Sequence, residues 1–323
     1  MKMKPILFLN PVFVQRIWGG NRLKTQFGYE IPSEKIGECW GVSAHAKGDC
    51  VVREGIYQGT LLSTLWKEHP ELFGYCDFER FPLLTKIIDS TEACSIQVHP
   101  DDDYAREHEN GSFGKMECWY VLDCHEDTKL VLGHNATSRE ELGEMIRQGK
   151  WSEFIREVPI KKGDFIQIDA GCVHAITAGL MVLETQQNSD ITYRIYDYGR
   201  LENGKQRPMH VEQSIDVITV PAPMESECIK HAGNLPVNCL NELISCEYYE
   251  VWKIDVEGSF AFLQEQLFLI MSIVEGEGSV NGHPVCKGDH FILPYEFGEV
   301  KLEGNMTIIA SSVNKERGEK NHD

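Results

Sequence analysis

The sequence lacks a surplus of basic residues and any long apolar run. Lys and Arg total 31 against 50 Asp and Glu, so the formal net charge is −19 at pH 7. A protein that binds nucleic acid or anionic membranes needs the opposite balance on its binding face. No stretch reaches the roughly 18 uninterrupted apolar residues of a membrane helix, and residues 1–13 lack the cleavage site of a signal peptide. We therefore expect a cytoplasmic protein with no nucleic-acid or membrane partner.

A C-x-x-C pair is also missing, although the sequence has 11 cysteines. An odd number of cysteines without paired spacing is not typical of a disulfide-stabilised secreted domain. Several stand in apolar runs, including Cys94, Cys118 and Cys172. We expect reduced, buried thiols of a cytoplasmic protein, with a catalytic thiol as the alternative.

A weak internal repeat indicates two similar domains. The segment KGDFIQI at 162–168 recurs as KGDHFIL at 287–293, and each follows a run of short apolar segments. This pattern predicts strands of two jelly-roll barrels in a mainly β protein. The chain of 323 residues is long enough for both. We place the boundary within 221–240 and expect a metal-binding catalytic domain at 1–225 and a degenerate second barrel without metal at 226–323.

Three segments have helical spacing of apolar residues. The clearest, at 137–158, begins with Thr137 or Ser138 as a cap and reads as an insertion between strands. A second helix is predicted at 60–73, with Thr60 as its N-cap and Pro70 as a break, and a short third one at 210–217.

Four separated residues form a candidate metal site. Gln97 and His99 are two positions apart in an apolar run, so on a strand they would point to the same face. Glu117 opens another strand-like run, and His174 follows a third run that ends in a glycine turn. Two imidazoles, a carboxylate and an amide oxygen suit zinc and leave a position open for water or substrate. Singly, each is more typical of a hydrogen-bonded core residue, and only their joint placement favours a metal.

Two further positions are candidates for a pocket. Lys86 lies in an apolar strand, where it either extends to an edge or becomes a buried cation that needs an anion. Trp18 precedes Gly19 and Gly20, which would permit a close backbone approach at a pocket rim or form a plain turn.

Four motifs together resemble the type I mannose-6-phosphate isomerases, specifically the short bacterial form. They are SIQVHPDD at 95–102, KMECWYVL at 115–122, GCVHAI at 171–176 and ETQQNSDITYRIYDYGR at 184–200. The resemblance implies a mainly β fold of two cupin barrels with a small helical insertion. It also implies a zinc enzyme that interconverts mannose 6-phosphate and fructose 6-phosphate.

The resemblance also implies roles for individual residues. The family's zinc ligands correspond to Gln97, His99, Glu117 and His174, the set that spacing suggests. Its catalytic positions correspond to Arg194, at the end of an S-D-x-x-x-R pattern, and to Lys115, Glu184 and Asp190. Residues expected to contact the sugar phosphate are Lys86, Ser95, Arg200 and Trp18, and Arg200 stands where longer relatives carry a lysine.

Aldose–ketose isomerisation removes a proton next to a carbonyl and returns it to the adjacent carbon through an enediolate. A metal and Arg194 would stabilise the negative charge. Lys115 is the candidate base, with Glu184 or Asp190 as the alternative.

Two other functions stay open. Two His and one carboxylate also form the metal triad of cupin oxygenases, and a cupin could bind sugars without catalysis. We expect a monomer or weak homodimer whose partner is a small sugar phosphate.

Overall fold

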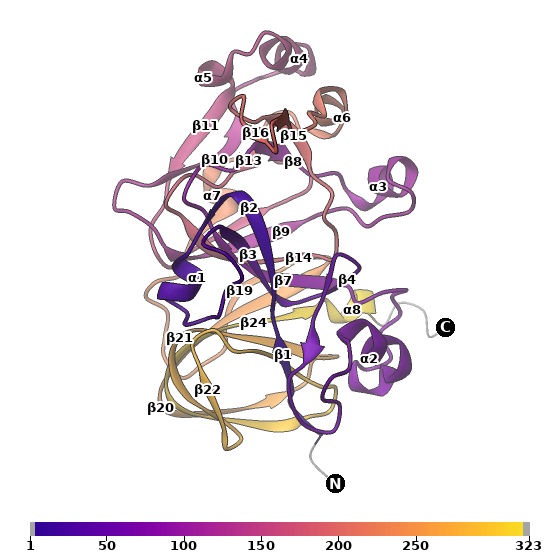
Figure 1. Ribbon diagram of the computed structural model, residues 1–323, viewed down its shortest axis with the longest axis vertical. Helices are drawn as coiled ribbons and strands as arrows, with labels where there is room; N and C mark the ends of the chain where they lie inside the picture. The colour runs from indigo at the N-terminus through magenta and orange to yellow at the C-terminus, as the bar shows by residue number, and fades with distance from the viewer. Residues whose placement is uncertain (1–3, 319–323) are drawn as a thin grey trace.

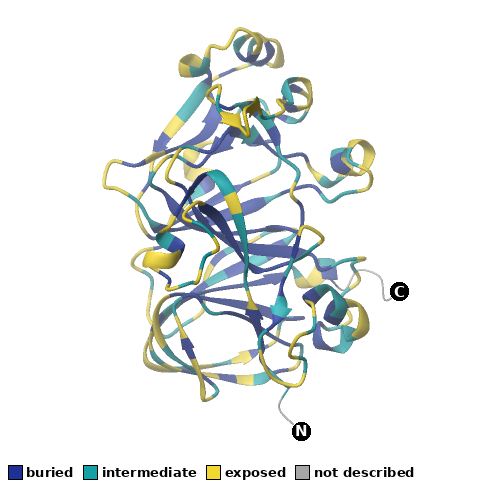
Figure 2. Ribbon diagram, in the orientation of Figure 1, coloured by how far each residue is buried: buried dark blue, intermediate teal, exposed yellow. Residues whose placement is uncertain are grey.

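Two β-rich halves are stacked along the long axis of the structure, a computed structural model that describes residues 4–318 (Figure 1). One half contains a seven-stranded and a five-stranded sheet, and the other is built around an eight-stranded sheet. Buried residues follow the strands of all three sheets, whereas exposed residues gather in loops and on the outer faces of helices (Figure 2). The strands therefore supply the core, and the loops between them supply the surface.

The first half is a sandwich of two antiparallel sheets. The seven-stranded sheet has the order β18 (Ile229–His231), β12 (Asp164–Ile168), β9 (Glu117–Asp123), β14 (Met181–Gln187), β7 (Leu83–Asp89), β3 (Ile36–Val42), β2 (Val12–Gly20). The five-stranded sheet has the order β11 (Ile155–Pro159), β10 (Lys129–His134), β13 (His174–Ala175), β8 (Ile96–Val98), β15 (Tyr193–Tyr196). Trp119 on β9 and Leu132 on β10 belong to one apolar core, which holds the two sheets face to face.

The second half is a curled eight-stranded sheet. Its order is β19 (Asn241–Ser245), β20 (Tyr249–Gln264), β24 (Gly298–Val313), β21 (Leu269–Val280), β23 (His290–Leu293), β1 (Leu7–Asn10), β6 (Val51–Val52), with β22 (His283–Cys286) on β21. Ile254, Met271 and Phe291 lie in its core. The predicted mainly β, cupin-type architecture is confirmed, although the sheets do not close into the predicted barrels.

The N-terminal strand belongs to the C-terminal sheet. Leu7 on β1 is paired with Ile292 on β23, and Leu9 is paired with Val52 on β6. The chain therefore crosses between the halves on both sides of β6 and between β1 and β2, as well as near residue 240. The division into domains at 1–225 and 226–323 stays a prediction.

Short helices and two small hairpins complete the fold. The helices are α1 (Arg22–Thr25), α2 (Leu62–Glu68), η1 (Pro70–Leu72), α3 (Asp102–His108), α4 (Arg139–Arg147), α5 (Trp151–Phe154), α6 (Val211–Val217), α7 (Glu225–Cys228) and α8 (Lys315–Gly318). The hairpins are β4 (Ala44–His45) with β5 (Gly48–Asp49), and β16 (Leu201–Glu202) with β17 (Lys205–Gln206). Helices α4, α5 and α6 lie at the end of the first half that is farthest from the second (Figure 1).

The predicted helical segments are largely confirmed. Helices α4 and α5 form the insertion, and the backbone N–H of Glu141 donates to the Ser138 Oγ cap at 3.2 Å. The predicted cap at Thr60 is wrong, because α2 begins later and Leu61 occupies the N-cap position without a side-chain bond. The plain-turn interpretation of Gly19 is also wrong. This residue lies within strand β2, where a Cβ would lie 2.4 Å from the Gly37 backbone nitrogen, so the glycine permits a close strand approach.

The predicted state of the cysteines is confirmed for Cys94, Cys118 and Cys172, which are free and buried. Burial raises the pKa of Cys94 and of Cys172 to about 12, so neither is a nucleophilic thiolate at neutral pH. Among residues 4–318, every helix falls short of the length and apolarity that a membrane crossing requires.

Contact between the two halves depends on a glycine. The backbone of Gly41 on β3 packs against the ring of buried His290 on β23. An added Cβ at Gly41 would lie 2.5 Å from three atoms of the imidazole ring. The ring is held in place by Ser272 Oγ at 2.8 Å from Nδ1 and by Tyr29 OH at 3.2 Å from Nε2. Because both ring nitrogens are occupied, the ring has no free position to move into.

We predict that Gly41→Ala lowers the free energy of unfolding by about 1–3 kcal/mol, because the new methyl group collides with a fixed ring. The control is Gly233→Ala, whose Cβ would lie 4.0 Å from its nearest neighbour. That change should be neutral or stabilising by up to about 1 kcal/mol. Urea denaturation of both variants measures the difference, and equal midpoints would contradict the predicted contact.

Candidate functional site

Three of the four predicted metal ligands converge in the first half. Donor atoms of His99, Glu117 and His174, which we call the metal cluster, lie within 4.8 Å of one another. Strand register explains this: Glu117 begins β9, and His174 on β13 is paired with Gln97 on β8. The fourth predicted ligand, Gln97, places its amide nitrogen 3.2 Å from His174 Nε2. The structure thus brings together four residues separated by up to 77 positions.

The protonation of the cluster suits a cation. Burial lowers the pKa of His174 to about 4 and that of His99 well below its usual value, so both imidazoles are neutral near pH 7. His174 Nδ1 donates to the Cys172 carbonyl at 2.9 Å, which leaves the lone pair of Nε2 facing Glu117 Oε1 at 3.2 Å. Within residues 4–318, neither Glu117 oxygen has a hydrogen bond of acceptable geometry, although the Lys115 ammonium lies 2.6 Å from Oε2. A buried carboxylate with acceptor capacity left over, beside two neutral imidazoles, fits a divalent ion.

Lys115 lies against the metal cluster. Its ammonium nitrogen is 2.6 Å from Glu117 Oε2, 3.0 Å from His99 Nε2 and 3.7 Å from Glu184 Oε1. The residue is only 4% exposed. It is thus the basic group that a substrate bound beside the metal cluster would meet first.

A ladder of charged residues runs across four neighbouring strands. Lys86 on β7 pairs with Glu184 on β14 at 3.0 Å, and the two residues are opposite in register. Glu184 Oε2 accepts a hydrogen bond from Trp119 Nε1 at 3.2 Å. Burial raises the pKa of Glu184 and nearby Glu117 adds to the increase, against the pull of the lysines. Lys86 is therefore the buried cation predicted from the sequence, with its anion supplied by the next strand.

Glu38 on β3 ends this ladder and was missed by the sequence analysis. Burial raises the pKa of its carboxyl, but Lys86 and Arg16 outweigh that effect and bring the pKa to about 2. Arg16 binds the carboxylate with Nε at 2.8 Å and Nη2 at 3.2 Å, and Trp40 Nε1 donates to it at 2.7 Å. A usable signal for this pair was present in the sequence. Arg16 and Glu38 each stand two positions before a tryptophan, Trp18 and Trp40, so on strands each charged residue shares a face with its tryptophan.

A cavity of about 300 Å³ opens beside the metal cluster, and we call it the substrate cavity. Its buried charged groups are Glu184, Lys115, Glu38 and Lys86, and its more exposed ones include Arg16 and Glu202. It is also lined by Trp18, Ser95, Gln97, Asp190, Arg194 and Arg207. Most sequence-predicted residues thus line one cavity, which adjoins the metal cluster through Gln97 and Lys115.

Arg194 reaches this cavity from β15. Its Nε donates to Ser95 Oγ at 3.2 Å and its Nη1 donates to the Pro208 carbonyl at 2.9 Å. Ser95 in turn donates to the amide oxygen of Gln97 at 3.3 Å, so Ser95 connects the arginine to a predicted ligand. Burial lowers the pKa of Arg194, and nearby Arg207 lowers it further.

Two predicted residues lie at the margin. Asp190 lines the substrate cavity but binds Lys47, and its side chain remains 35% exposed. Arg200 does not line the cavity. It donates to the carbonyls of Ala93 and Asp197 and faces a neighbouring surface pocket. Arg207, which the sequence analysis missed, occupies the cavity wall instead.

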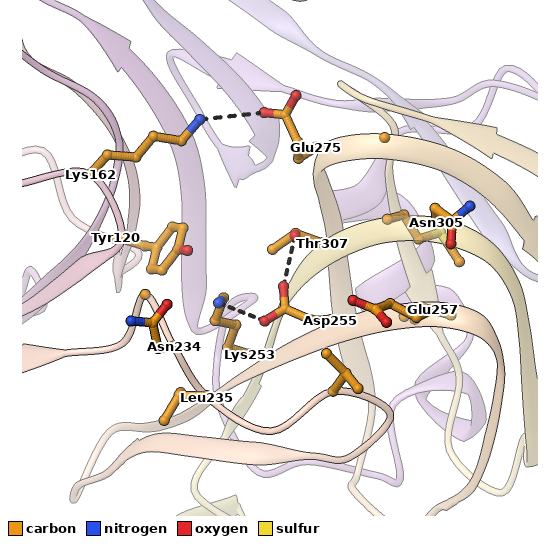
Figure 3. A pocket seen from close by; sticks show the side chains of 16 residues that line it. Tyr120, Lys162, Asn234, Leu235, Lys253, Asp255, Glu257, Glu275, Asn305 and Thr307 are labelled. Carbon is orange, nitrogen blue, oxygen red and sulfur yellow. Dashed lines mark hydrogen bonds and ion pairs between the residues drawn. The ribbon is translucent and has the colours of Figure 1, made fainter.

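A larger cavity of about 850 Å³ lies at the junction of the halves (Figure 3). Most of its charged groups are paired with one another. Asp255 contacts Lys253 at 2.6 Å and accepts from Thr307 at 2.8 Å, and Lys162 is 3.9 Å from Glu275. Among the described residues, the metal-ligating groups that cluster are His99, Glu117 and His174, which lie outside this cavity, so we assign the functional site to the substrate cavity.

Comparison with known proteins agrees with this assignment. Residues 6–127 match the profile of the phosphomannose isomerase type I catalytic domain, and residues 240–313 match the mannose-6-phosphate isomerase cupin domain. The mannose-6-phosphate isomerase ManA of Bacillus subtilis is 49% identical over 312 residues, which cover 95% of this chain and 98% of that protein. A mannose-6-phosphate isomerase of Streptococcus mutans is 43% identical and covers 96% of this chain and 98% of its own length.

Solved structures agree as well. A crystal structure of the mannose 6-phosphate isomerase from Bacillus subtilis matches with a TM-score of 0.89 at 43% identity, covering 96% of this chain and all of that one. A putative mannosephosphate isomerase from Archaeoglobus fulgidus has the same fold, with a TM-score of 0.77 at 22% identity and coverage of 97% and 99%.

We predict that the metal-free protein binds one Zn²⁺ per chain and that Glu117→Gln weakens this binding by at least about 100-fold, because even outer contacts of metal ligands contribute 10–100-fold. Isothermal titration calorimetry at pH 7 measures the affinity. Glu275→Gln, which removes a more exposed carboxylate from the junction cavity, is the matched control and should bind like the unmodified protein. Equal zinc affinity in the Glu117 and Glu275 variants would refute the assigned cluster.

Proposed function

The chain belongs to the type I phosphomannose isomerase family, and on that premise we propose that it interconverts mannose 6-phosphate and fructose 6-phosphate in the substrate cavity. The observation that carries the proposal is the convergence of His99, Glu117 and His174 beside a cavity that Arg194 and Lys115 also reach. Proton transfer would pass through an enediol or enediolate. Family membership favours this reaction over an oxygenase or a non-catalytic sugar-binding cupin.

The metal would be a single divalent ion, and its donor set favours zinc. Gln97, His99, Glu117 and His174 would hold it, because two neutral imidazoles, a carboxylate and an amide suit this ion. When bound, the ion supplies Lewis-acid stabilisation of negative charge on the sugar oxygens.

Arg194 has the position to orient the open-chain sugar. Ser95 and the Pro208 carbonyl fix its guanidinium, and its Nη2 has no partner among the described residues. A fixed cation with an unused N–H group can donate to an oxygen on which charge develops, without paying for reorganisation during the reaction. We propose that Arg194 stabilises the enediolate in this way.

Lys115 is the proposed base. Its nitrogen is the basic group nearest the metal cluster, and it lines the cavity. Glu184 is the alternative base, because its pKa is raised toward neutral pH, where a general base works best. Asp190 is less suited to proton transfer, since its contacts with His45 and Lys47 outweigh partial burial and lower its pKa. We propose that Asp190 instead fixes the wall of the cavity through its contacts with His45 and Lys47.

Ser95, Trp18 and Lys86 would line the bound sugar, as the resemblance implies. Arg200 would act less directly, because it faces the adjacent pocket. We further propose a cytoplasmic enzyme that is a monomer or weak homodimer, with the catalytic domain at 1–225 and a metal-free second cupin domain at 226–323.

We predict that the purified protein converts mannose 6-phosphate into fructose 6-phosphate and that dialysis against a chelator abolishes the activity, because the metal cluster is part of the site. A coupled assay for fructose 6-phosphate measures this, and added Zn²⁺ should restore the rate. An active protein with no bound metal would contradict the metal dependence, and a metal-bound protein inactive on mannose 6-phosphate would contradict the function.

We predict that Lys115→Met lowers kcat by about 10²–10⁴-fold and abolishes exchange of the C2 proton of the substrate with solvent deuterium, because the base is lost. Lys162→Met, which removes an exposed lysine at the junction cavity, should leave both unchanged. Zinc content and thermal melting are measured in parallel, since Lys115 contacts Glu117. Near-normal C2 exchange in Lys115→Met would transfer the role of base to Glu184.

A further inference from the structure

The more exposed part of the substrate cavity contains two arginines that the proposed chemistry does not use. Arg16 extends from β2, and Arg207 follows the β16–β17 hairpin. Both line the cavity together with Arg194. Three guanidinium groups around one small space repel one another, and each of the other two lowers the pKa of Arg194. Such an arrangement is favourable when an anion binds between them.

Each of the two arginines is fixed by one acid and keeps donors unused. Arg207 binds Asp197 with Nε at 2.8 Å and Nη2 at 2.5 Å, as Arg16 binds Glu38 with the same two nitrogens. In the part of the chain that the structure describes, Nη1 of neither arginine has a partner. A two-point contact leaves a guanidinium rigid and points its remaining N–H groups in a fixed direction.

Lys86 and Lys115 are poorly placed to bind a further anion. The nitrogen of Lys86 is 3.0 Å from Glu184, and that of Lys115 is 2.6 Å from Glu117. Both lysines are nine-tenths or more buried, so a phosphate would have to displace a buried carboxylate from each. The arginines require no such exchange.

The shape of the substrate separates its two ends. The carbons that exchange a proton are C1 and C2, whereas the phosphate is on C6 at the other end of the open chain. If C1 and C2 lie at the metal cluster, the phosphate must lie in the part of the cavity farthest from it. Arg16, with a side chain 36% exposed, and Arg207, at 11%, stand nearer the solvent than the metal cluster does.

We propose that Arg16 and Arg207 form the phosphate subsite, each giving its free Nη1 to a phosphate oxygen. This inference rests on the proposed function, because it places C1 and C2 at the metal cluster. The cavity has five cationic residues, Arg16, Lys86, Lys115, Arg194 and Arg207, against four acidic ones, Glu38, Glu184, Asp190 and Glu202. The lining is therefore richer in positive charge than a chain of net charge −19 is on average, which favours the entry of a dianion.

The test measures inorganic phosphate and the sugar phosphate separately. In the zinc-loaded protein, Arg207→Gln and Arg16→Gln should each weaken inorganic phosphate, measured as a dissociation constant by calorimetry at fixed ionic strength, by about tenfold or more. Each should raise KM for mannose 6-phosphate by a similar factor and leave kcat within about threefold, because the reacting carbons are not touched. Lys205→Gln, an exposed charge on the same hairpin, is the control for long-range electrostatics and should change neither constant.

Using both Arg16→Gln and Arg207→Gln keeps the test decisive if one of the two proteins is unstable. Glu38 retains Trp40 when Arg16 is removed, and Asp197 retains Arg200 when Arg207 is removed, so both carboxylates remain paired. Phosphate affinity and KM that stay within twofold of the unmodified protein in both variants would overturn the subsite. An inactive unmodified protein whose phosphate affinity still depends on both arginines would reject the isomerase function and retain the anion subsite. An unmodified protein that isomerises normally, with phosphate affinity unchanged in both arginine variants, would reject the anion subsite and retain the isomerase function.

Discussion

Compensation of buried charge is the constraint on which the site depends. Strands β3, β7, β14 and β9 are successive neighbours, and each contributes one charged residue: Glu38, Lys86, Glu184 and Glu117. Burying any one of them alone would cost several kcal/mol. Arg16 contacts Glu38, and Lys115 contacts both of the neighbouring carboxylates Glu184 and Glu117, so every charge has an opposite neighbour. The ladder fixes the side chains around the metal cluster through the sheet itself, without help from flexible loops.

The same ladder divides the work among the positive groups. Lys86 and Lys115 lie within the sandwich next to the metal cluster, and each is paired with a carboxylate. Arg16 and Arg207 lie nearer the solvent, and each binds an acid through Nε and Nη2 and leaves Nη1 unpaired among the described residues. Planar guanidinium groups suit this double use, because their five N–H donors point in fixed directions. A lysine in place of Arg16 has a single compact ammonium group, so it could not contact Glu38 and a ligand through separate edges.

The sequence contained the metal cluster because its residues stand in local patterns. Two-residue spacing joins Gln97 to His99, and a strand start and a glycine turn mark Glu117 and His174; the resemblance added Arg194 and Lys115. What the sequence could not supply was pairing between distant segments. Arg207 stands in an unremarkable polar stretch and reaches the cavity only because Asp197 holds it, and the partner of Lys86 depends on a register nearly 100 residues away. Thr60 failed as a cap for a similar reason, since local propensity did not fix where α2 begins.

Pairing of β1 with β23 has a consequence for how the chain is made. One edge of β1 can pair with β6 once Val52 has been synthesised, but the other edge finds its neighbour only when Phe291 and Ile292 have been added. Until then the apolar residues Leu7 and Phe8 lie on a strand with one unpaired edge, and such edges are sites of aggregation. That edge stays unprotected while more than 200 residues are added, so chaperone protection of this segment would matter more here than in a protein whose domains close one after the other.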